Sequence, residues 1–577
     1  MNNLKKQILS VAVATSTVLS CVPVSMAAIP ADVQGTRYEE PVQILSALNI
    51  MVGDENGAYR LDDTIIRSEV AKMAIHALGL EDAAESSKGQ TMFDDVSAEH
   101  WANGYINLAV SQGIIEGDGD GNFRPNAPIS YAEAMTIMVR ATGYTVSAEE
   151  NGGYPHGYMK TGTSNGLAKN VQGSYSDKIS RGNVAYLTTN ALESKLMEQT
   201  GFGSDGKYEI TEKTLLKDKL KVTKDTGRIT AIENTSLTGS SSLAKGQIKI
   251  DNKTYETAYN MNNLLGYNVT YYVKNEGKND ESVILAMPIQ NQNNDLTISS
   301  ELFSKLTTKN GNTAIEYFKD ENTSKTNTAE ISSDATLIYN GKYQAMDKNL
   351  IDLTDKSGNI TLLDSNKNGK YDIVFVKNYE NIVVDSVSST GKIVDKYSQK
   401  VLKLDDTVDF RITKGLEEIS VSDLAEYDVL SVAASLDKEL YEVEVTNKTV
   451  EGKVTGKDSK GVLINGTKYK VAANYTDSID IGSEGVFYLD IDGKIAALDG
   501  STTLSSNYAY LMKAYYTKNT EKASFKLFTK DGKEVTLDAN NKIKFNGKSN
   551  VKALDVVNSL NTSEDAVSYT HLRAHET

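Results

Sequence analysis

The chain has 577 residues, a formal net charge of −16 and a single cysteine. This length corresponds to about three or four domains, and 39% hydrophobic residues are enough to form packed cores. The acidic balance excludes a nucleic-acid-binding protein that relies on bulk positive charge. One cysteine excludes a disulfide framework and a cysteine-based zinc site. Residues 28–200 hold 23 acidic and 12 basic side chains, a net of −11, whereas residues 201–566 hold 53 and 46, a net of −7.

The first 27 residues have the features of a secretory signal peptide. Lys5 and Lys6 precede an uncharged apolar stretch, and Ser25-Met26-Ala27 fits a small-x-small cleavage site. We therefore expect a secreted chain that is cut after Ala27. We expect no transmembrane segment in the mature chain, because no later stretch reaches about 18 apolar residues. The alternative is a lipoprotein in which Cys21 carries the lipid.

The last eleven residues, 567–577, resemble the in-frame translation of a sequencing adapter. We exclude them from the fold prediction, as is done for processing and cloning segments. The expectation is that the natural chain continues past residue 566.

Residues 28–200 contain an internal repeat. Gly53–Arg60 aligns with Gly117–Arg124 at an offset of 64 residues, and the same offset pairs Glu69 with Glu133. Each unit is predicted to form a helix, a glycine-rich loop and a second helix. In the second unit, Ser130-x-x-Glu133 predicts a capping box at the start of the later helix.

The second unit resembles the S-layer homology (SLH) domain family. The matching segments are Phe93-x-Asp95, Trp101-Ala102, Gly113-Ile114-Ile115-x-Gly117, Gly121-x-Phe123-x-Pro125 and Ala132-Glu133. A shorter third unit ends with Ile179-Ser180-Arg181 and a closing helix. The resemblance implies three repeats at residues 28–88, 89–150 and 151–205, folded as a three-pronged α-helical pseudo-trimer.

The same resemblance implies non-covalent anchoring to secondary cell-wall polysaccharide on a Gram-positive-type cell surface. The family's binding groove uses an arginine at the start of each later helix. Arg67 and Arg181 occupy that position in units one and three, and Tyr131 replaces the arginine in unit two. The other candidate groove residues are Asp95, Trp101 and Gly117.

The chemistry of arginine fits this role. A guanidinium presents a planar fork to a carboxylate, such as a ketal-linked pyruvate on a sugar, and a helix N-terminus adds free N–H groups. Because residues 28–200 are acidic, recognition must rest on local arginine geometry and not on long-range steering. The alternatives are a surface ion pair for Arg67 and Arg181, a capping role for Glu69 and Glu133, and a core position for Trp101.

Residues 206–450 and 451–566 are predicted to form all-β modules, each a sandwich or a small barrel. Short β-branched and aromatic runs alternate with Asn-Gly and Asp-Gly dipeptides, which are strong hairpin signals. These dipeptides are Asn340-Gly341, Asn465-Gly466, Asp492-Gly493, Asp531-Gly532 and Asn546-Gly547. Module boundaries are expected near residues 295 and 450. Asp334–Asp352 and Asn540–Asp555 are weakly alike, each built around Asn-Gly-Lys.

One loop in the β-rich region has the spacing of a calcium site. Asp364, Asn366, Asn368 and Asp372 place oxygen donors as in EF-hand and dockerin-type loops, and Gly369 permits the sharp turn. Phe375 stands where the twelfth-position acid is usual. The alternative is an Asn/Gly-rich turn before a strand at residues 373–376. Calcium is the only cofactor that the sequence suggests.

No catalytic constellation is present, so the sequence predicts a protein that is not an enzyme. Two hypotheses follow. The first is a structural or adhesive surface protein that is anchored by the repeats and self-associates in a surface layer. The second is an anchored enzyme, such as a polysaccharide hydrolase, whose catalytic domain lies beyond residue 566.

Overall fold

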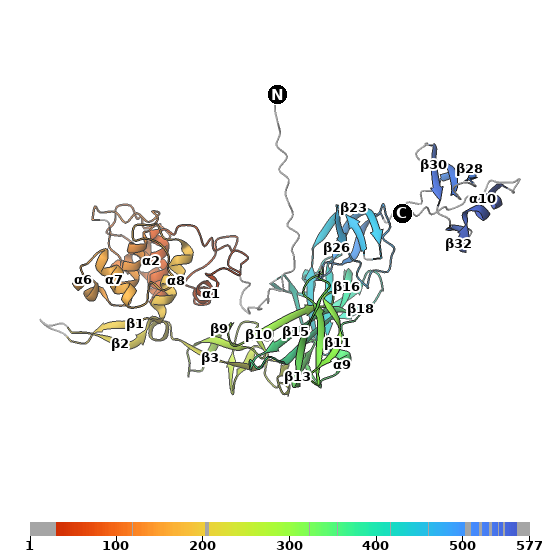
Figure 1. The fold of residues 1–577 in the computed structure, drawn as a ribbon. Helices are drawn as coiled ribbons and strands as arrows, with labels where there is room; N and C mark the ends of the chain where they lie inside the picture. Colours follow the sequence, from red (N-terminus) through yellow and green to blue (C-terminus); the bar gives the residue numbers. More distant parts are fainter. Residues whose placement is uncertain are drawn as a thin grey trace, which may run out of the picture. The chain divides into compact units, whose positions relative to one another are not determined.

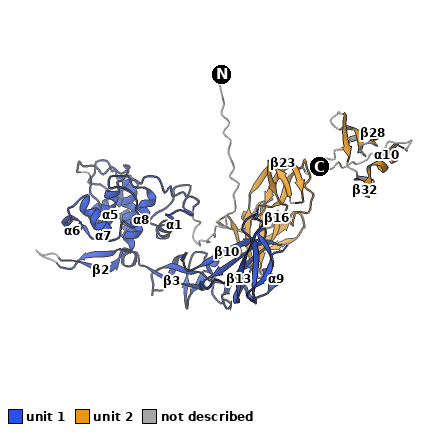
Figure 2. Cartoon of the chain, in the orientation of Figure 1, with its two compact units in different colours: residues 1–377 blue, residues 378–577 orange. Residues whose placement is uncertain are grey.

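The computed structural model describes residues 30–117, 119–201, 207–321, 323–354, 356–415, 417–459, 461–501, 509–517, 522–529, 534–539, 542–545 and 548–561. The predicted signal peptide with Cys21, the adapter-like tail and the dipeptides at 531–532 and 546–547 lie outside these ranges. The chain divides into two compact units, residues 1–377 and residues 378–577 (Figure 2).

The first part of unit 1 is helical, as predicted, and forms the cluster of helices in Figure 1. The helices are α1 (Glu39–Ala47), α2 (Arg67–Ala77), α3 (Glu81–Ser86), α4 (Asn103–Ser111), α5 (Tyr131–Ala141), α6 (Thr145–Glu150), α7 (His156–Ser164) and α8 (Arg181–Glu193). They pack as three groups: α2 with α3 and α4, α5 with α6 and α7, and α8 with α1.

The three groups meet at a closed ring of backbone hydrogen bonds. The amide of Ile65 donates to the carbonyl of Ile179 (3.2 Å), Ile179 donates to Ile129 (3.1 Å), and Ile129 donates back to Ile65 (3.1 Å). All three side chains are at most 3% exposed. This ring gives the module pseudo-threefold symmetry and places the first residues of α2, α5 and α8 at equivalent positions.

The helix starts follow the predicted capping chemistry. Ser130 Oγ accepts a hydrogen bond from the Glu133 amide (3.3 Å), and Glu133 Oε2 accepts one from the Ser130 amide (2.7 Å). The capping box is therefore confirmed. Glu69 likewise accepts from the Ile66 amide (3.1 Å), which confirms its capping role.

The rest of unit 1 is rich in strands. These are β1 (Lys195–Gln199), β2 (Tyr208–Thr214), β3 (Val222–Ala231), β4 (Thr235–Ser236), β5 (Gly239–Ser240), β6 (Gln247–Ile250), β7 (Lys253–Glu256), β8 (Asn268–Lys274), β9 (Ser282–Pro288), β10 (Asn294–Ser299), β11 (Phe303–Lys309), β12 (Asn312–Phe318), β13 (Thr326–Tyr339), β14 (Lys342–Gln344) and β15 (Ser357–Asp364). Three short helical segments interrupt them: η1 (Leu215–Lys219), η2 (Asn262–Leu264) and α9 (Lys348–Ile351). The division between the units falls within β16 (Tyr371–Val387).

Unit 2 is also β-rich. Its strands are β17 (Lys392–Asp395), β18 (Val401–Lys403), β19 (Asp409–Lys414), β20 (Glu417–Ile419), β21 (Val429–Ala434), β22 (Leu440–Thr446), β23 (Thr449–Asp458), β24 (Gly461–Ile464), β25 (Thr467–Tyr469), β26 (Glu484–Leu489), β27 (Ile495–Ser501), β28 (Ala509–Thr517), β29 (Lys522–Thr529), β30 (Glu534–Ala539), β31 (Lys542–Phe545) and β32 (Lys548–Lys552). Its helical segments are η3 (Val421–Asp423) and α10 (Ala553–Asn561).

The three predicted hairpin dipeptides that lie in described segments are confirmed. Asn340-Gly341 joins β13 to β14 with φ values of 44° and 80°, and Asn465-Gly466 joins β24 to β25 with 51° and 82°. Two successive positive φ values are typical of type I′ turns, which match the twist of the flanking strands. Asp492-Gly493 lies between β26 and β27. The predicted class, helical repeats followed by β-rich modules, is therefore observed, and one sheet closes into a small barrel through the additional pairing of β3 with β8. Among the described helices, none has the length and apolar character needed to cross a membrane.

Candidate functional site

Arg67 is the first residue of α2 and reaches across to the next repeat. Its Nη1 lies 2.7 Å from Glu133 Oε1 on α5, and its Nε donates to the carbonyl of Phe123 (2.8 Å). The residue is only 9% exposed. The guanidinium also lies over the Phe123 ring at 4.9 Å. Arg67 therefore joins the first and second repeats.

Arg181 repeats this arrangement at the start of α8. Its Nη1 lies 2.7 Å from Glu69 Oε1 on α2, and its Nε donates to the carbonyl of Tyr59 (2.8 Å). A third, longer bond of 3.4 Å joins Nη2 to the carbonyl of Val52. Arg181 is 7% exposed. Because both arginines are buried, the ion pair is part of the module's packing and not a solvated surface pair.

The carboxylate partner of Arg67 has an altered pKa. Burial alone would raise the pKa of Glu133, but hydrogen bonds from Ser130 and the positive charge of Arg67 outweigh burial and lower it. Glu133 is therefore ionised over a wide pH range. One carboxylate caps its own helix and neutralises an arginine from the neighbouring repeat.

The interface between the second and third repeats lacks an arginine–glutamate pair at the equivalent positions. Tyr131 occupies the first position of α5, is 5% exposed, and has a pKa raised by burial. The residue at the glutamate position of α8 is Asn183, whose side chain bonds its own helix cap, Ser180. The pseudo-threefold module thus has two charged interfaces and one neutral one.

An exposed aromatic side chain accompanies the Arg67–Glu133 pair. Tyr154, just before α7, is 57% exposed. Burial of its hydroxyl and the charge of Glu133 raise its pKa, while a hydrogen bond with Ser130 and the charge of Arg67 act in the opposite direction. The charges of Glu133 and Arg67 both act on the Tyr154 hydroxyl, and more than half of the residue is exposed. The sequence analysis did not identify Tyr154 as a site residue.

Trp101 occupies the equivalent position before α4. The spacing from Trp101 to Tyr154 is 53 residues, the same as from Gly104 to Gly157. Each of these glycines packs closely against a backbone carbonyl of the preceding short helix. Trp101 is 49% exposed and its ring stacks on His100 with centroids 5.8 Å apart. Trp101 is therefore not a core residue, which settles one of the alternatives in the sequence analysis.

Asp95 and Gly117 shape the loop of the second repeat. The Asp95 carboxylate accepts hydrogen bonds from the amides of Phe123 (2.8 Å) and Arg124 (2.7 Å). A Cβ on Gly117 would lie 2.4 Å from the Phe93 ring. These two residues hold the loop that supplies the carbonyl partners of Arg67. Asp32 does the same in the first repeat, where its carboxylate accepts from two consecutive amides, and the sequence analysis missed it.

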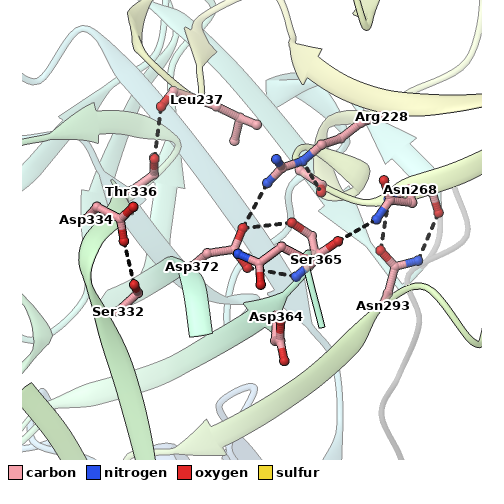
Figure 3. Close-up of polar contacts among 12 residues, drawn as sticks. Arg228, Leu237, Asn268, Asn293, Ser332, Asp334, Thr336, Asp364, Ser365 and Asp372 are labelled. Atoms are coloured by element: carbon pink, nitrogen blue, oxygen red, sulfur yellow. Dashed lines mark hydrogen bonds and ion pairs between the residues drawn. The ribbon is translucent and has the colours of Figure 1, made fainter. Parts of the chain in front are cut away.

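The candidate calcium loop lies in unit 1 between β15 and β16 (Figure 3). The Asp364 carboxylate is 2% exposed and accepts from the amides of Asn368 (3.3 Å) and Gly369 (3.0 Å). Asp372 instead faces Arg228, with Oδ2 3.0 Å from Nη2, and accepts from the Ser365 amide (2.7 Å).

In Figure 3 the Asp364 side chain points away from Asp372, which is joined to Arg228 and Ser365. Across the described ranges, no three His, Cys, Asp or Glu side chains come together as a metal site. Calcium binding by Asp364, Asn366, Asn368 and Asp372 therefore stays a prediction.

Comparisons with known proteins agree with this geometry. The S-layer homology domain profile matches residues 31–71 and 93–135. The chain contains S-layer homology domains. The two profile matches lie within the first two predicted repeats. The backbone ring that includes Ile179 relates the third predicted repeat to them.

Three curated relatives align with this chain over most of its length. It is 27% identical to the Middle cell wall protein of Brevibacillus brevis, over 94% of this chain and 59% of that protein. It is 25% identical to the Surface layer protein of Brevibacillus choshinensis, over 92% of this chain and 54% of that protein. It is 27% identical to the Cell surface protein of Thermoanaerobacter kivui, over 93% of this chain and 68% of that protein. The SLH chain spans a little more than half the length of the first two.

Proposed function

We propose that the SLH repeats bind cell-wall polysaccharide and hold the β-rich modules at the cell surface. The observation that carries this proposal is a motif that occurs twice: a buried arginine–glutamate pair, with an exposed aromatic ring at the same position in its repeat. The two pairs are Arg67–Glu133 and Arg181–Glu69. Tyr154 supplies the ring for the first, and we assign Trp101 to the second because it holds the equivalent position in its repeat.

Each part of the motif has a role in binding a sugar. The aromatic ring offers an apolar face to the C–H side of a pyranose. The glutamate accepts hydrogen bonds from sugar hydroxyls, and the arginine and the helix N-terminus attract an acidic substituent. Because the polar groups are already fixed by their contacts with each other, binding costs little additional ordering.

The interface at Tyr131 and Asn183 lacks a charged pair, so we propose two functional grooves and not three. The names of the relatives, which include cell-wall and surface-layer proteins, support a structural role without catalysis. They also support the proposal that copies of this chain associate in a surface layer.

Co-sedimentation of the full chain with purified cell-wall polysaccharide tests the anchoring role. Trp101→Ala and Tyr154→Ala should each weaken binding about 3- to 10-fold, the range expected for one aromatic contact of roughly 0.5–1.5 kcal/mol. The double variant should lose more than either single variant. Both rings are about half exposed, so folding should be unaffected.

Tyr175→Ala is the matched control. Tyr175 is 49% exposed in the same helical region, and its ring packs near His156 and not beside an arginine–glutamate pair. Its substitution should leave binding unchanged. Equal binding by the control and the double variant would contradict the proposed grooves.

A further inference from the structure

The described part of the β-rich region contains four copies of one strand arrangement. The copies, here called modules 1 to 4, span residues 222–288, 294–376, 378–446 and 449–501. In each module the first strand pairs antiparallel with the penultimate strand. A turn then leads from the penultimate strand to the last strand. The pairs of first and penultimate strands are β3–β8, β10–β15, β16–β21 and β23–β26.

The last strand of every module also makes at least one parallel residue pair with an earlier segment of the same module. These parallel pairs are β7–β9, β13–β16, β19–β22 and the bridge between Val471 and Ile495. Antiparallel hairpins alone would not produce a parallel pair, so its presence in all four modules indicates a common fold. The penultimate and last strands of each module, with the turn between them, are here called the closing hairpin.

Three modules share a second feature just before the penultimate strand. Gly266, Tyr427 and Gly482 have φ values of 87°, 68° and 97° in modules 1, 3 and 4. Each donates its amide to the first strand, at the carbonyls of Ile229 (2.8 Å), Val384 (2.9 Å) and Val454 (2.9 Å). In return, the amides of Ile229, Val384 and Val454 donate to the carbonyl of the residue that follows the positive-φ position. These acceptors are Tyr267, Asp428 and Ser483, respectively. We call this position the corner of the module.

In unit 1, the closing hairpin of module 2 lies against the corner of module 1. A Cβ on Gly266 would lie 2.1 Å from Ile373 Cδ1. Arg228 donates from Nε to the Gly266 carbonyl (3.0 Å) and pairs with Asp372 (Figure 3). Asn268 Nδ2 donates to the Ser365 carbonyl (2.8 Å).

Unit 2 shows the same contact between modules 3 and 4. Tyr427 at the corner of module 3 stacks on Tyr488 of the closing hairpin of module 4, with ring centroids 4.8 Å apart and planes 13° apart. Asn381 Nδ2 donates to Asp490 Oδ2 (2.7 Å) in the turn of that hairpin. A small apolar cluster that includes Val383 and Ala497 fills the contact.

We propose that the corner is a docking surface whose partner is the closing hairpin of the module that follows in the chain. The residue with positive φ determines which side chain of the following hairpin packs against the corner. In unit 1, Gly266 leaves room for Ile373, and in unit 2, Tyr427 stacks on Tyr488. The predicted calcium loop is the turn of the module 2 hairpin. Its polar groups hold the hairpin on module 1, through the Ser365 carbonyl and Asp372.

Hydrogen exchange of the full chain, measured by mass spectrometry, tests this docking. Gly266→Ala should raise exchange at least tenfold across residues 363–373, because the added methyl group displaces Ile373. Gly482→Ala is the matched control, since Gly482 also has a positive φ but a Cβ there would meet no atom within 4 Å. It should raise exchange only near Val454 and Ser483.

A rescue variant separates docking from backbone strain. Ile373→Ala in the Gly266→Ala background removes the clashing atom, so protection of residues 363–373 should return to within about threefold of the Ile373→Ala variant alone. Unchanged exchange at 363–373 in Gly266→Ala would overturn the proposal, and so would an equal increase there in Gly482→Ala. If Gly266→Ala unfolds module 1, Asn268→Ala provides the test of docking in its place. This variant should raise hydrogen exchange at Ser365 severalfold, and unchanged exchange there would overturn the proposal.

Discussion

Replacing Arg67 with methionine is expected to destabilise the helical repeats by about 4 kcal/mol. The substitution removes a charge-assisted hydrogen bond to Glu133, worth roughly 1.5–3 kcal/mol. It also leaves the Phe123 carbonyl without its side-chain donor, which costs roughly 1–3 kcal/mol when the group is buried. The sum agrees with the roughly 3–5 kcal/mol found when one partner of a buried pair is removed.

Calorimetry of the full chain measures this effect. For a module of this size, about 4 kcal/mol corresponds to a decrease of roughly 10 °C in the melting temperature of the helical transition. Arg124→Met is the control, because Arg124 pairs with Asp120 on the surface, where both side chains are about half exposed. That pair should contribute less than about 1 kcal/mol. A loss of under 1 kcal/mol for Arg67→Met, equal to the control, would show that the Arg67–Glu133 pair does not join the repeats.

Three further predictions concern other parts of the chain. Burial lowers the pKa of His76 below 6.5; Lys72 acts in the same direction, and Glu81 on α3 and the Asn49 backbone oppose it. The free energy of unfolding should therefore be highest above pH 6.5 and should decrease as the pH falls towards the folded-state pKa, because the unfolded chain binds the proton more readily. In urea titrations, His76→Gln should show a weaker decrease. Calcium at 1 mM should raise the melting temperature by several degrees if the Asp364 loop binds the ion as the sequence predicts; an unchanged melting temperature would show that the Arg228 pair with Asp372 and the backbone amides on Asp364 keep these carboxylates from the ion. Tyr131→Arg with Asn183→Glu should create a third charged interface, and titration calorimetry with a defined wall oligosaccharide should then give a stoichiometry of three where the unaltered chain gives two.

The repeat pattern predicted the elements of the helical module but not its contacts. The 64-residue offset paired Glu69 with Glu133, the family resemblance pointed to Arg67, and the capping box at Ser130 was correct. The sequence did not show that Arg67 bonds the glutamate of the next repeat, because that contact depends on the threefold ring. Tyr154 was missed because the third repeat is shorter, so its equivalence to Trp101 requires a different offset of 53 residues.

For the β-rich region, the sequence predicted the all-β class and the local hairpins, but not the strand order that the modules share. Asn340-Gly341 and Asn465-Gly466 correctly marked hairpins, since two positive φ values need these residue types. The four modules were not recognised, because module 2 carries the inserted pair β11 and β12 and because a parallel pairing between distant strands leaves no sequence spacing. The loop at Asp364 stays a predicted calcium site, because tight turns and calcium loops both use alternating Asp, Asn and Gly and the sequence alone does not distinguish them.

The buried position of the arginines also changes how anchoring must be tested. Loss of polysaccharide binding in Arg67→Ala or Arg181→Ala has two explanations, because either change removes a ligand group and also separates two repeats. Trp101 and Tyr154 avoid this ambiguity, since each ring is about half exposed while its repeat is held by other residues. If the aromatic variants bind normally and only the arginine variants fail, the arginines act by assembling the module. If the aromatic variants fail while the helical melting transition is unchanged, the grooves themselves bind the polymer.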